Sequence, residues 1–339
     1  MAILKRLIIM FMPVLLAGCY EDFTPKTFTT PVLCLNSLIT AGQPIVVNVS
    51  HTWLYSDGNT NSEHKVSDAT VTVYANGKIV DSGYLPAQGD KIKIEAESPT
   101  YGKADAEVTV PRAVIPVKLR VHPELTAAHK AESDEPLEMS ANISFNISFE
   151  MDLADDTEVV NYYKVSHTGF FHSGNLYDED DPWGWPSPPY SDFNPGSLKY
   201  EAEPIFSEHI GVFESIMGGD SYGFTFFTDR QFSGSEYTLH LRFLDCSYMV
   251  RSEKWDEEFL DCGYVITLHT VSKSYYDWAN YLWQRDNGPL EEMGQIGLGE
   301  PLWGYSNVST GAGVVAAEAS VSFTVNLDEF LGKAISELK

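Results

Sequence analysis

The residue whose position most clearly points to chemistry is Cys19, because a cysteine thiol can accept covalently attached lipid. A basic pair, Lys5 and Arg6, precedes an apolar run that ends at Leu16. The run is too short to cross a bilayer comfortably and is typical of a removable signal peptide. It closes with the letters LAGC, which match the lipobox at which lipoprotein signal peptides are cut. We therefore predict a signal peptide over residues 1–18 and a membrane anchor on the lipidated Cys19.

A second set of residues is suited to binding at a surface. It consists of the aromatic residues Tyr177, Trp183, Trp185 and Tyr190, with prolines between them. Exposed indole and phenol rings bury a large area against a partner or stack on sugar rings, and prolines hold such rings at low entropic cost. Three interpretations stay open: this segment docks a protein partner, it stacks on a glycan or other small ligand, or its tryptophans fold back to fill a β-sandwich.

A run of acidic residues lies next to this aromatic segment. Residues 178–181 read DEDD, and carboxylates are the ligands that Ca²⁺ prefers. Asp178, Asp180 and Asp181 are therefore a weak calcium candidate. Their spacing differs from that of the EF-hand loop, so a solvated charge run is the preferred interpretation.

Two cysteines, Cys246 and Cys262, flank the acidic segment 252–261, which we interpret as the tip of a hairpin. In an oxidising compartment such a pair can form a disulfide. The sequence leaves the disulfide and two free thiols equally open.

The remaining patterns favour a protein that is not an enzyme and carries no cofactor. The nine histidines form neither a helical zinc motif nor an alternating pair on one strand, and no phosphate-binding loop or serine elbow is present. The net charge of −26 would repel the phosphates of nucleic acid, which excludes nucleic acid as a partner. Two carboxylates of a glycoside hydrolase leave no local signature, so an extracellular hydrolase stays an alternative.

The patterning predicts a mostly β protein, and the 43% hydrophobic content is enough to build packed cores. Residues 19–30 are expected to form a tether behind the anchor. Residues 31–112 show alternation of period two, as in Lys91–Glu95, and an Asn76-Gly77 hairpin turn. We interpret them as an immunoglobulin-like β-sandwich.

Residues 113–339 are predicted to form a larger β-rich domain. Its clearest strand is 142–151, where Phe145 and Phe149 belong to one apolar face. A helix is expected near 274–287, with Ser274 as its N-cap, and a C-terminal helix near 327–338.

Several segments, in order, resemble a family of uncharacterised Bacteroidetes outer-membrane lipoproteins that contain a domain of unknown function. The matching segments are 32–45 (VLCLNSLITAGQPI), 66–77 (VSDATVTVYANG), 227–234 (FTDRQFSG), 299–301 (GEP) and 306–313 (SNVSTGAG). The resemblance covers nearly all of the chain after the signal peptide. It carries over no catalytic residue.

The resemblance implies a surface-facing lipoprotein accessory to TonB-dependent nutrient uptake, with a TonB-dependent outer-membrane receptor as its partner. Glu21 and Asp22, directly behind Cys19, resemble the acidic export signal of lipoproteins on the extracellular face of the outer membrane. A structural envelope or adhesion protein is a further alternative. Ligand identity, the particular receptor and the oligomeric state do not follow from the sequence.

Overall fold

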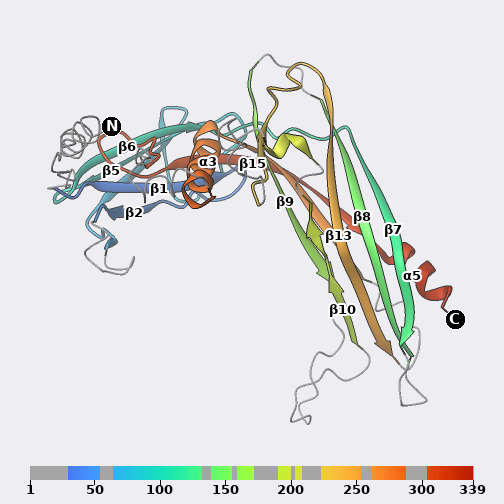
Figure 1. Cartoon of the computed structure of the whole chain (residues 1–339). Coiled ribbons are helices and arrows are strands. Elements are labelled where there is room, and N and C mark those ends of the chain that lie inside the picture. Colours follow the sequence, from blue (N-terminus) through green and yellow to red (C-terminus); the bar gives the residue numbers. More distant parts are fainter. Residues whose placement is uncertain are drawn as a thin grey trace, which may run out of the picture.

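The computed structural model describes residues 30–53, 64–131, 139–154, 159–171, 190–199, 203–207, 223–252, 261–287 and 304–338. These residues form three β-sheets, two α-helices and a short 3₁₀-helix, η4 (Pro204–Ser207). The mostly β class predicted from the sequence is confirmed. Figure 1 shows two lobes that meet at an angle, with strand β15 running from one into the other.

The largest sheet has six strands, and it extends through both lobes. Their order across the sheet is β12 (Phe226–Thr228), β9 (Tyr162–Phe171), β14 (Cys262–Val271), β15 (Val315–Asn326), β1 (Leu33–Thr40) and β2 (Asn48–His51). All neighbouring strands are antiparallel except β1 and β15, which are parallel. This sheet therefore joins segments from the beginning, the middle and the end of the chain.

Two antiparallel sheets cover the two halves of the six-stranded sheet. The first lobe contains the four-stranded sheet β4 (Lys78–Val80), β3 (Thr70–Ala75), β5 (Lys91–Ser98) and β6 (Gly102–Thr109). The second lobe contains the five-stranded sheet β10 (Tyr190–Asn194), β13 (Glu236–Ser252), β8 (Met139–Ala154) and β7 (Lys118–Ala131), with β11 (Ser197–Leu198) paired to β13. Each lobe is thus two layers of sheet around its own core.

The cores follow from the alternation that the sequence predicts. On β5, Ile92 and Ile94 are fully buried, while Lys91, the first residue of the strand, faces solvent. Asn76 and Gly77 both have positive φ angles (51° and 80°), as a type I′ hairpin turn requires, and they connect β3 to β4. On β8, Phe145 and Phe149 are fully buried, as predicted.

The predicted boundary at residue 112 falls between the two cores, but the first core also takes residues from the end of the chain. It contains strands β1, β5 and β6 together with Val308, Val315 and Ala317. The second core begins with β8 and continues to Ile335. Residues 31–112 alone therefore do not make the first lobe, and their immunoglobulin-like arrangement stays a prediction.

The segment 308–314 closes one side of the first lobe. Ser309 exchanges backbone hydrogen bonds with Asp105 of β6, and Ala312 does so with Leu33 and Leu35 of β1. A Cβ atom on Gly311 would lie 2.4 Å from the Leu33 carbonyl oxygen, and one on Gly313 would lie 2.2 Å from that of Leu35. Only glycine permits this close approach of backbone to backbone.

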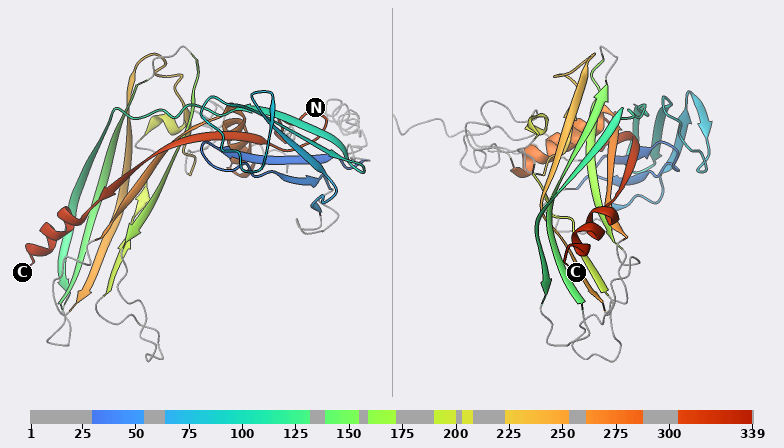
Figure 2. Two further views of the ribbon diagram at one scale, coloured as in Figure 1. Left: turned by 180° about the vertical axis from the view of Figure 1, so that it is seen from behind. Right: turned by 90° about the vertical axis from the view of Figure 1, so that its right-hand side faces the viewer.

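The two helices lie where the sequence places them, with a corrected start for the first. Helix α3 (Lys273–Asn287) begins one residue earlier than predicted, and the Oγ of Ser272, not Ser274, accepts a hydrogen bond from the N–H of Tyr275 (3.3 Å). Ser274 instead donates to the carbonyl of Val315 (2.9 Å) and ties the helix to β15. Helix α5 (Asp328–Ser336) follows β15 at the chain end, as Figure 2 shows. No helix of the described residues is long and apolar enough to cross a membrane.

The predicted hairpin between Cys246 and Cys262 is wrong. Cys246 lies on β13, which pairs with β8 and β10, whereas Cys262 lies on β14, which pairs with β9 and β15. The two strands therefore belong to opposite sheets of the second lobe. Both cysteines are free thiols in the structure, so the disulfide left open by the sequence is not formed. Tyr264 packs beside Cys246 and donates to its Sγ (3.3 Å).

We expect Phe149→Ala to lower the free energy of unfolding by roughly 3–5 kcal/mol, because it would leave a cavity in a fully packed core. Phe149 contacts the rings of Phe243 and Tyr264 at centroid distances of 5.6 Å and 5.4 Å. Urea unfolding measures the change. Ile115→Ala is the matched control, since Ile115 is 72% exposed and its truncation should change stability by about 0.5 kcal/mol or less. Equal effects of the two substitutions would contradict the assignment of Phe149 to the core.

Candidate functional site

Most of the residues that the sequence singles out lie outside the described residues. These are Cys19, Tyr177, Trp183, Trp185, Asp178, Asp180 and Asp181. Tyr190 is the first residue of β10, and its backbone pairs with that of Arg251 on β13. Among the described residues, β9 ends at Phe171 and β10 begins at Tyr190, on either side of the aromatic segment in the sequence.

In the sequence, the aromatic segment lies between the end of β9 and the start of β10. β14 begins at Cys262, which pairs with Phe171 at the end of β9. It ends at Val271, which pairs with Glu318 near the first lobe. Nine residue steps along a strand correspond to about 30 Å. The chain therefore leaves β9 at Phe171, roughly 30 Å from the junction of the lobes.

The described residues bring together a polar cluster at that junction, which the sequence did not predict. At Glu318, strand β15 has partners on both sides, Thr40 of β1 and Val271 of β14. Before this position β15 pairs with β1, and after it β15 pairs with β14. We call Thr40, Ser166, His269 and Glu318 the junction cluster.

The four side chains of the junction cluster come from four strands. Their contacts form a chain that leads from Thr40 to Glu318, then to His269 and then to Ser166. His269 Nδ1 lies 3.1 Å from Glu318 Oε2, within ion-pair distance but without forming a hydrogen bond. The other ring nitrogen, Nε2, is 2.9 Å from Ser166 Oγ, and Thr40 Oγ1 donates to Glu318 Oε1 at 3.3 Å. The side chains of His269 and Glu318 are only 14% and 11% exposed.

The carboxylate of this cluster is held in its ionised form. Burial alone would raise the pKa of Glu318, but the contact with His269, the charge of Lys164 and the hydroxyl of Thr40 outweigh burial and lower it. Lys164 Nζ in turn donates to the hydroxyl of Tyr275 (3.3 Å) and lies 5.7 Å from the ring centroid of Phe226. Helix α3, which carries Tyr275, therefore borders the cluster.

The contacts lead from a serine, Ser166, through a histidine, His269, to an acid, Glu318. Serine hydrolases use the same residue types in the same order of contact, as nucleophile, base and orienting acid. Such chemistry also needs N–H donors for a developing oxyanion. Ser166 and His269 lie on β9 and β14, which pair in register along their whole length, so the sheet fixes the two side chains beside each other. What the cluster does in the described structure is connect four strands across the junction.

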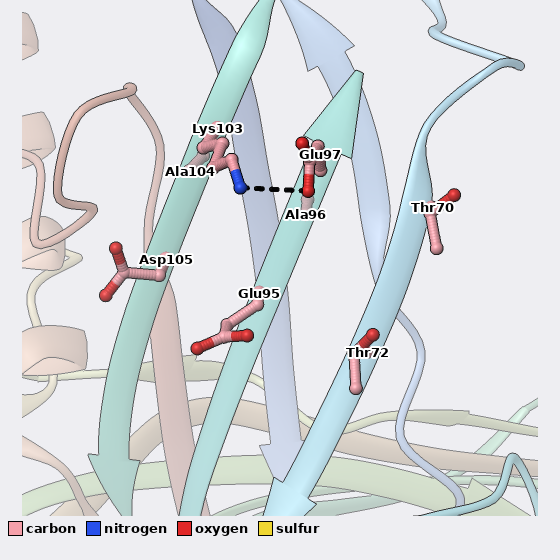
Figure 3. Close-up of a pocket in the computed structure, with 8 residues that line it drawn as sticks. All are labelled: Thr70, Thr72, Glu95, Ala96, Glu97, Lys103, Ala104 and Asp105. Carbon is pink, nitrogen blue, oxygen red and sulfur yellow. Dashed lines mark ion pairs between the residues drawn. The ribbon is translucent and has the colours of Figure 1, made fainter. Parts of the chain in front are cut away.

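A shallow hollow of about 240 Å³ lies on the outer face of the four-stranded sheet. Its polar lining residues are Thr70 and Thr72 of β3, Glu95 and Glu97 of β5, and Lys103 and Asp105 of β6. Figure 3 shows Lys103 reaching Glu97, where the ion pair measures 3.1 Å. These charges are largely exposed and partly paired, which is typical of a solvated sheet face.

The thiols of Cys246 and Cys262 and the carboxylate of Asp229 are buried. Burial raises the pKa of Cys262 to about 12, so this thiol is protonated and unreactive at neutral pH. Asp229 is fully buried and accepts hydrogen bonds from the backbone and side chain of Asn161 (2.7–2.9 Å), which fixes the turn after β12. Among the described residues, no group of three or more His, Cys, Asp or Glu side chains is arranged to hold a metal ion.

Comparison with protein families places the chain in a class without an assigned activity. The family model described as "Domain of unknown function (DUF4249)" matches residues 20–324, and the chain belongs to this family. A search of curated proteins and a search of solved structures found no match. The resemblance seen in the sequence is thereby confirmed at the level of a family of unknown function.

We expect Glu318→Gln to lower the free energy of unfolding at pH 7 by about 1–3 kcal/mol, because His269 would lose its buried charged partner. The folded protein lowers the pKa of Glu318, so the stabilisation is present above the ordinary carboxyl pKa and is lost as the pH falls below it. Urea unfolding from pH 7 to pH 3 should therefore show a shallower acid loss in the variant. Glu97→Gln is the control, since its ion pair with Lys103 is exposed and contributes about 1 kcal/mol or less.

Proposed function

We propose that this protein is a lipid-anchored outer-membrane protein that assists TonB-dependent nutrient uptake by binding a protein partner or ligand, without catalysis. The observation that carries the proposal is the LAGC motif ending at Cys19, directly behind an apolar run of signal-peptide length. Several acyl chains on one cysteine give firm attachment, since each buried methylene contributes about 0.8 kcal/mol. The acids Glu21 and Asp22 support the extracellular face.

The arrangement of the two lobes supports a role in docking. The anchor precedes β1, and β1 runs parallel to β15 toward the junction, so it starts at the end of the first lobe away from the junction. The aromatic segment follows β9, which ends roughly 30 Å beyond the junction in the second lobe. The start of β1, which follows the anchor in the sequence, and the end of β9, which precedes the aromatic segment, therefore lie at opposite ends of the described structure.

The net charge supports a body that stays in solution beside the membrane to which Cys19 anchors it. At −26 the chain is strongly acidic, which opposes self-association and adhesion to anionic lipid headgroups. A TonB-dependent receptor is the proposed partner by family resemblance, and the aromatic residues Tyr177, Trp183, Trp185 and Tyr190 are its proposed contacts. The immunoglobulin-like character of residues 31–112 belongs to the same proposal.

Cys19→Ala tests the anchor. We expect the variant to lose labelling by a fatty-acid analogue and to accumulate as the uncut precursor, because the thiol is the lipid acceptor. Metabolic labelling followed by gel electrophoresis reads both effects. Cys34→Ala is the matched control, since this cysteine lies inside strand β1 and should leave labelling unchanged. Normal labelling of the Cys19→Ala protein would rule out the lipoprotein assignment.

The double substitution Trp183→Ala, Trp185→Ala tests the docking role. If the indoles anchor a partner, binding should weaken by about 2 kcal/mol or more, or at least thirtyfold, while stability changes by about 0.5 kcal/mol or less. Co-purification with the TonB-dependent receptor and thermal melting measure the two effects. Trp53→Ala, in the first lobe, should keep the receptor bound. A large drop in melting temperature would show instead that the two tryptophans fill the core.

A further inference from the structure

Two histidines that are thirteen positions apart in the sequence face each other at the edge of the first lobe. Ser50 forms a backbone bridge with Lys65, and the N–H of Val66 donates to the carbonyl of Val49. Continuing this antiparallel register by one residue places His51, at the end of β2, opposite His64. Their ring centroids are 5.0 Å apart.

The imidazole of His64 is buried without satisfying either of its nitrogens. The residue is 4% exposed, and neither Nδ1 nor Nε2 has a hydrogen-bond partner. Removing such a group from water without replacing its hydrogen bonds is destabilising, so native structures rarely do it. A buried nitrogen of this kind commonly marks the place of a bound water or ion.

The partner histidine has one nitrogen committed and one available. His51 Nδ1 lies 3.0 Å from the carbonyl oxygen of Thr52, an acceptor, so Nδ1 carries the proton and Nε2 carries the lone pair. Metal-binding histidines usually donate their second nitrogen in this way, which fixes both the tautomer and the orientation of the ring. The hydrogen bond therefore prepares Nε2 of His51 as a ligand.

Two aromatic side chains hold the imidazole rings from outside. Trp53 stacks on His64 with centroids 4.0 Å apart and planes 2° from parallel, and Tyr101 stacks on His51 at 4.5 Å and 10°. The four rings form a continuous stack with one perpendicular step between the two imidazoles. Rings fixed in this way lose little further freedom when they bind a ligand.

We propose that His51 and His64 form a two-histidine site for a divalent transition-metal ion such as Cu²⁺, Ni²⁺ or Zn²⁺. Imidazole nitrogen is a preferred ligand of these three ions, and metal–nitrogen bonds of about 2.0–2.1 Å fit two rings whose centroids are roughly 5 Å apart. Calcium and magnesium are excluded as occupants because they take oxygen ligands. Two protein ligands leave the remaining positions of the ion to water or to donor atoms of a small molecule. The site is independent of the proposed docking role.

The test is a titration of the purified, lipidated full-length protein, produced without a polyhistidine tag, with CuSO₄, NiCl₂ and ZnCl₂. Isothermal titration calorimetry should show one ion per chain. Cu²⁺ should also quench part of the tryptophan fluorescence, because Trp53 lies against His64, and Trp53→Phe should remove that part of the quenching.

The matched substitutions are His51→Phe and His64→Phe, which keep an aromatic ring in the stack but remove the nitrogens. Each should weaken metal binding by about tenfold or more, since altering the second shell alone commonly costs 10–100-fold. His122→Ala, an exposed histidine on β7, should bind as the unaltered protein does. The proposal would be overturned if the unaltered protein did not bind the ions, or if both phenylalanine variants bound them with the affinity of the unaltered protein.

A measurement on the unaltered protein guards against variants that do not fold. Bound Zn²⁺ should protect His51, the more accessible histidine of the pair, from modification by diethylpyrocarbonate while His122 continues to react, as read by mass spectrometry of the peptides. Equal modification of His51 with and without Zn²⁺ would also overturn the proposal. The four rings would then be a purely apolar stack at the end of β2.

Discussion

The structure depends on a single strand that serves two cores. The first four residues of β15, ending at Glu318, pair with β1 in parallel, and Glu318 and the residues after it pair with β14 in antiparallel register. Because side chains alternate between the faces of a strand, a shift of one residue would turn the apolar set of both cores outward. The register of β15 therefore fixes the relation between the two lobes. Glu318, which has strand partners on both sides, marks the position where one core ends and the other begins.

The polar contacts of Glu318 explain how a charged residue can occupy this position. A buried carboxylate is costly unless it is paired and hydrogen-bonded. His269 lies within ion-pair distance of Oε2, Thr40 donates a hydrogen bond to Oε1, and Ser166 contacts the other nitrogen of the imidazole. The cluster has the residue types of a catalytic relay, and its four side chains come from the four strands that meet at the junction. Its position is better explained by the need to join β1, β9, β14 and β15 at one point.

Three of the five segments that carry the family resemblance contain turns or close approaches of the backbone. Segment 306–313 closes the first lobe through Gly311, segment 227–234 contains the turn fixed by Asp229, and segment 66–77 ends in the Asn76-Gly77 turn. These residues are constrained by backbone conformation and close approach. The two proposed binding sites lie outside these segments. The candidates are the aromatic segment beyond β9 and the histidine pair beside β2.

The sequence by itself determined the features that depend on neighbouring residues. Alternation identified β5 and β8 and their buried faces, the Asn-Gly pair identified a hairpin, and helical spacing placed α3 and α5 to within one or two residues. Signal-peptide chemistry at Cys19 is also a local pattern, and the fold leaves it a prediction. Only the tertiary structure decided which strands are neighbours. It separated Cys246 from Cys262, brought residues 308–317 back to the first core, and assembled the junction cluster and the His51–His64 pair. Local periodicity reports which face of a strand is apolar but not which strand lies beside it, because pairing partners are selected by the packing of the whole chain.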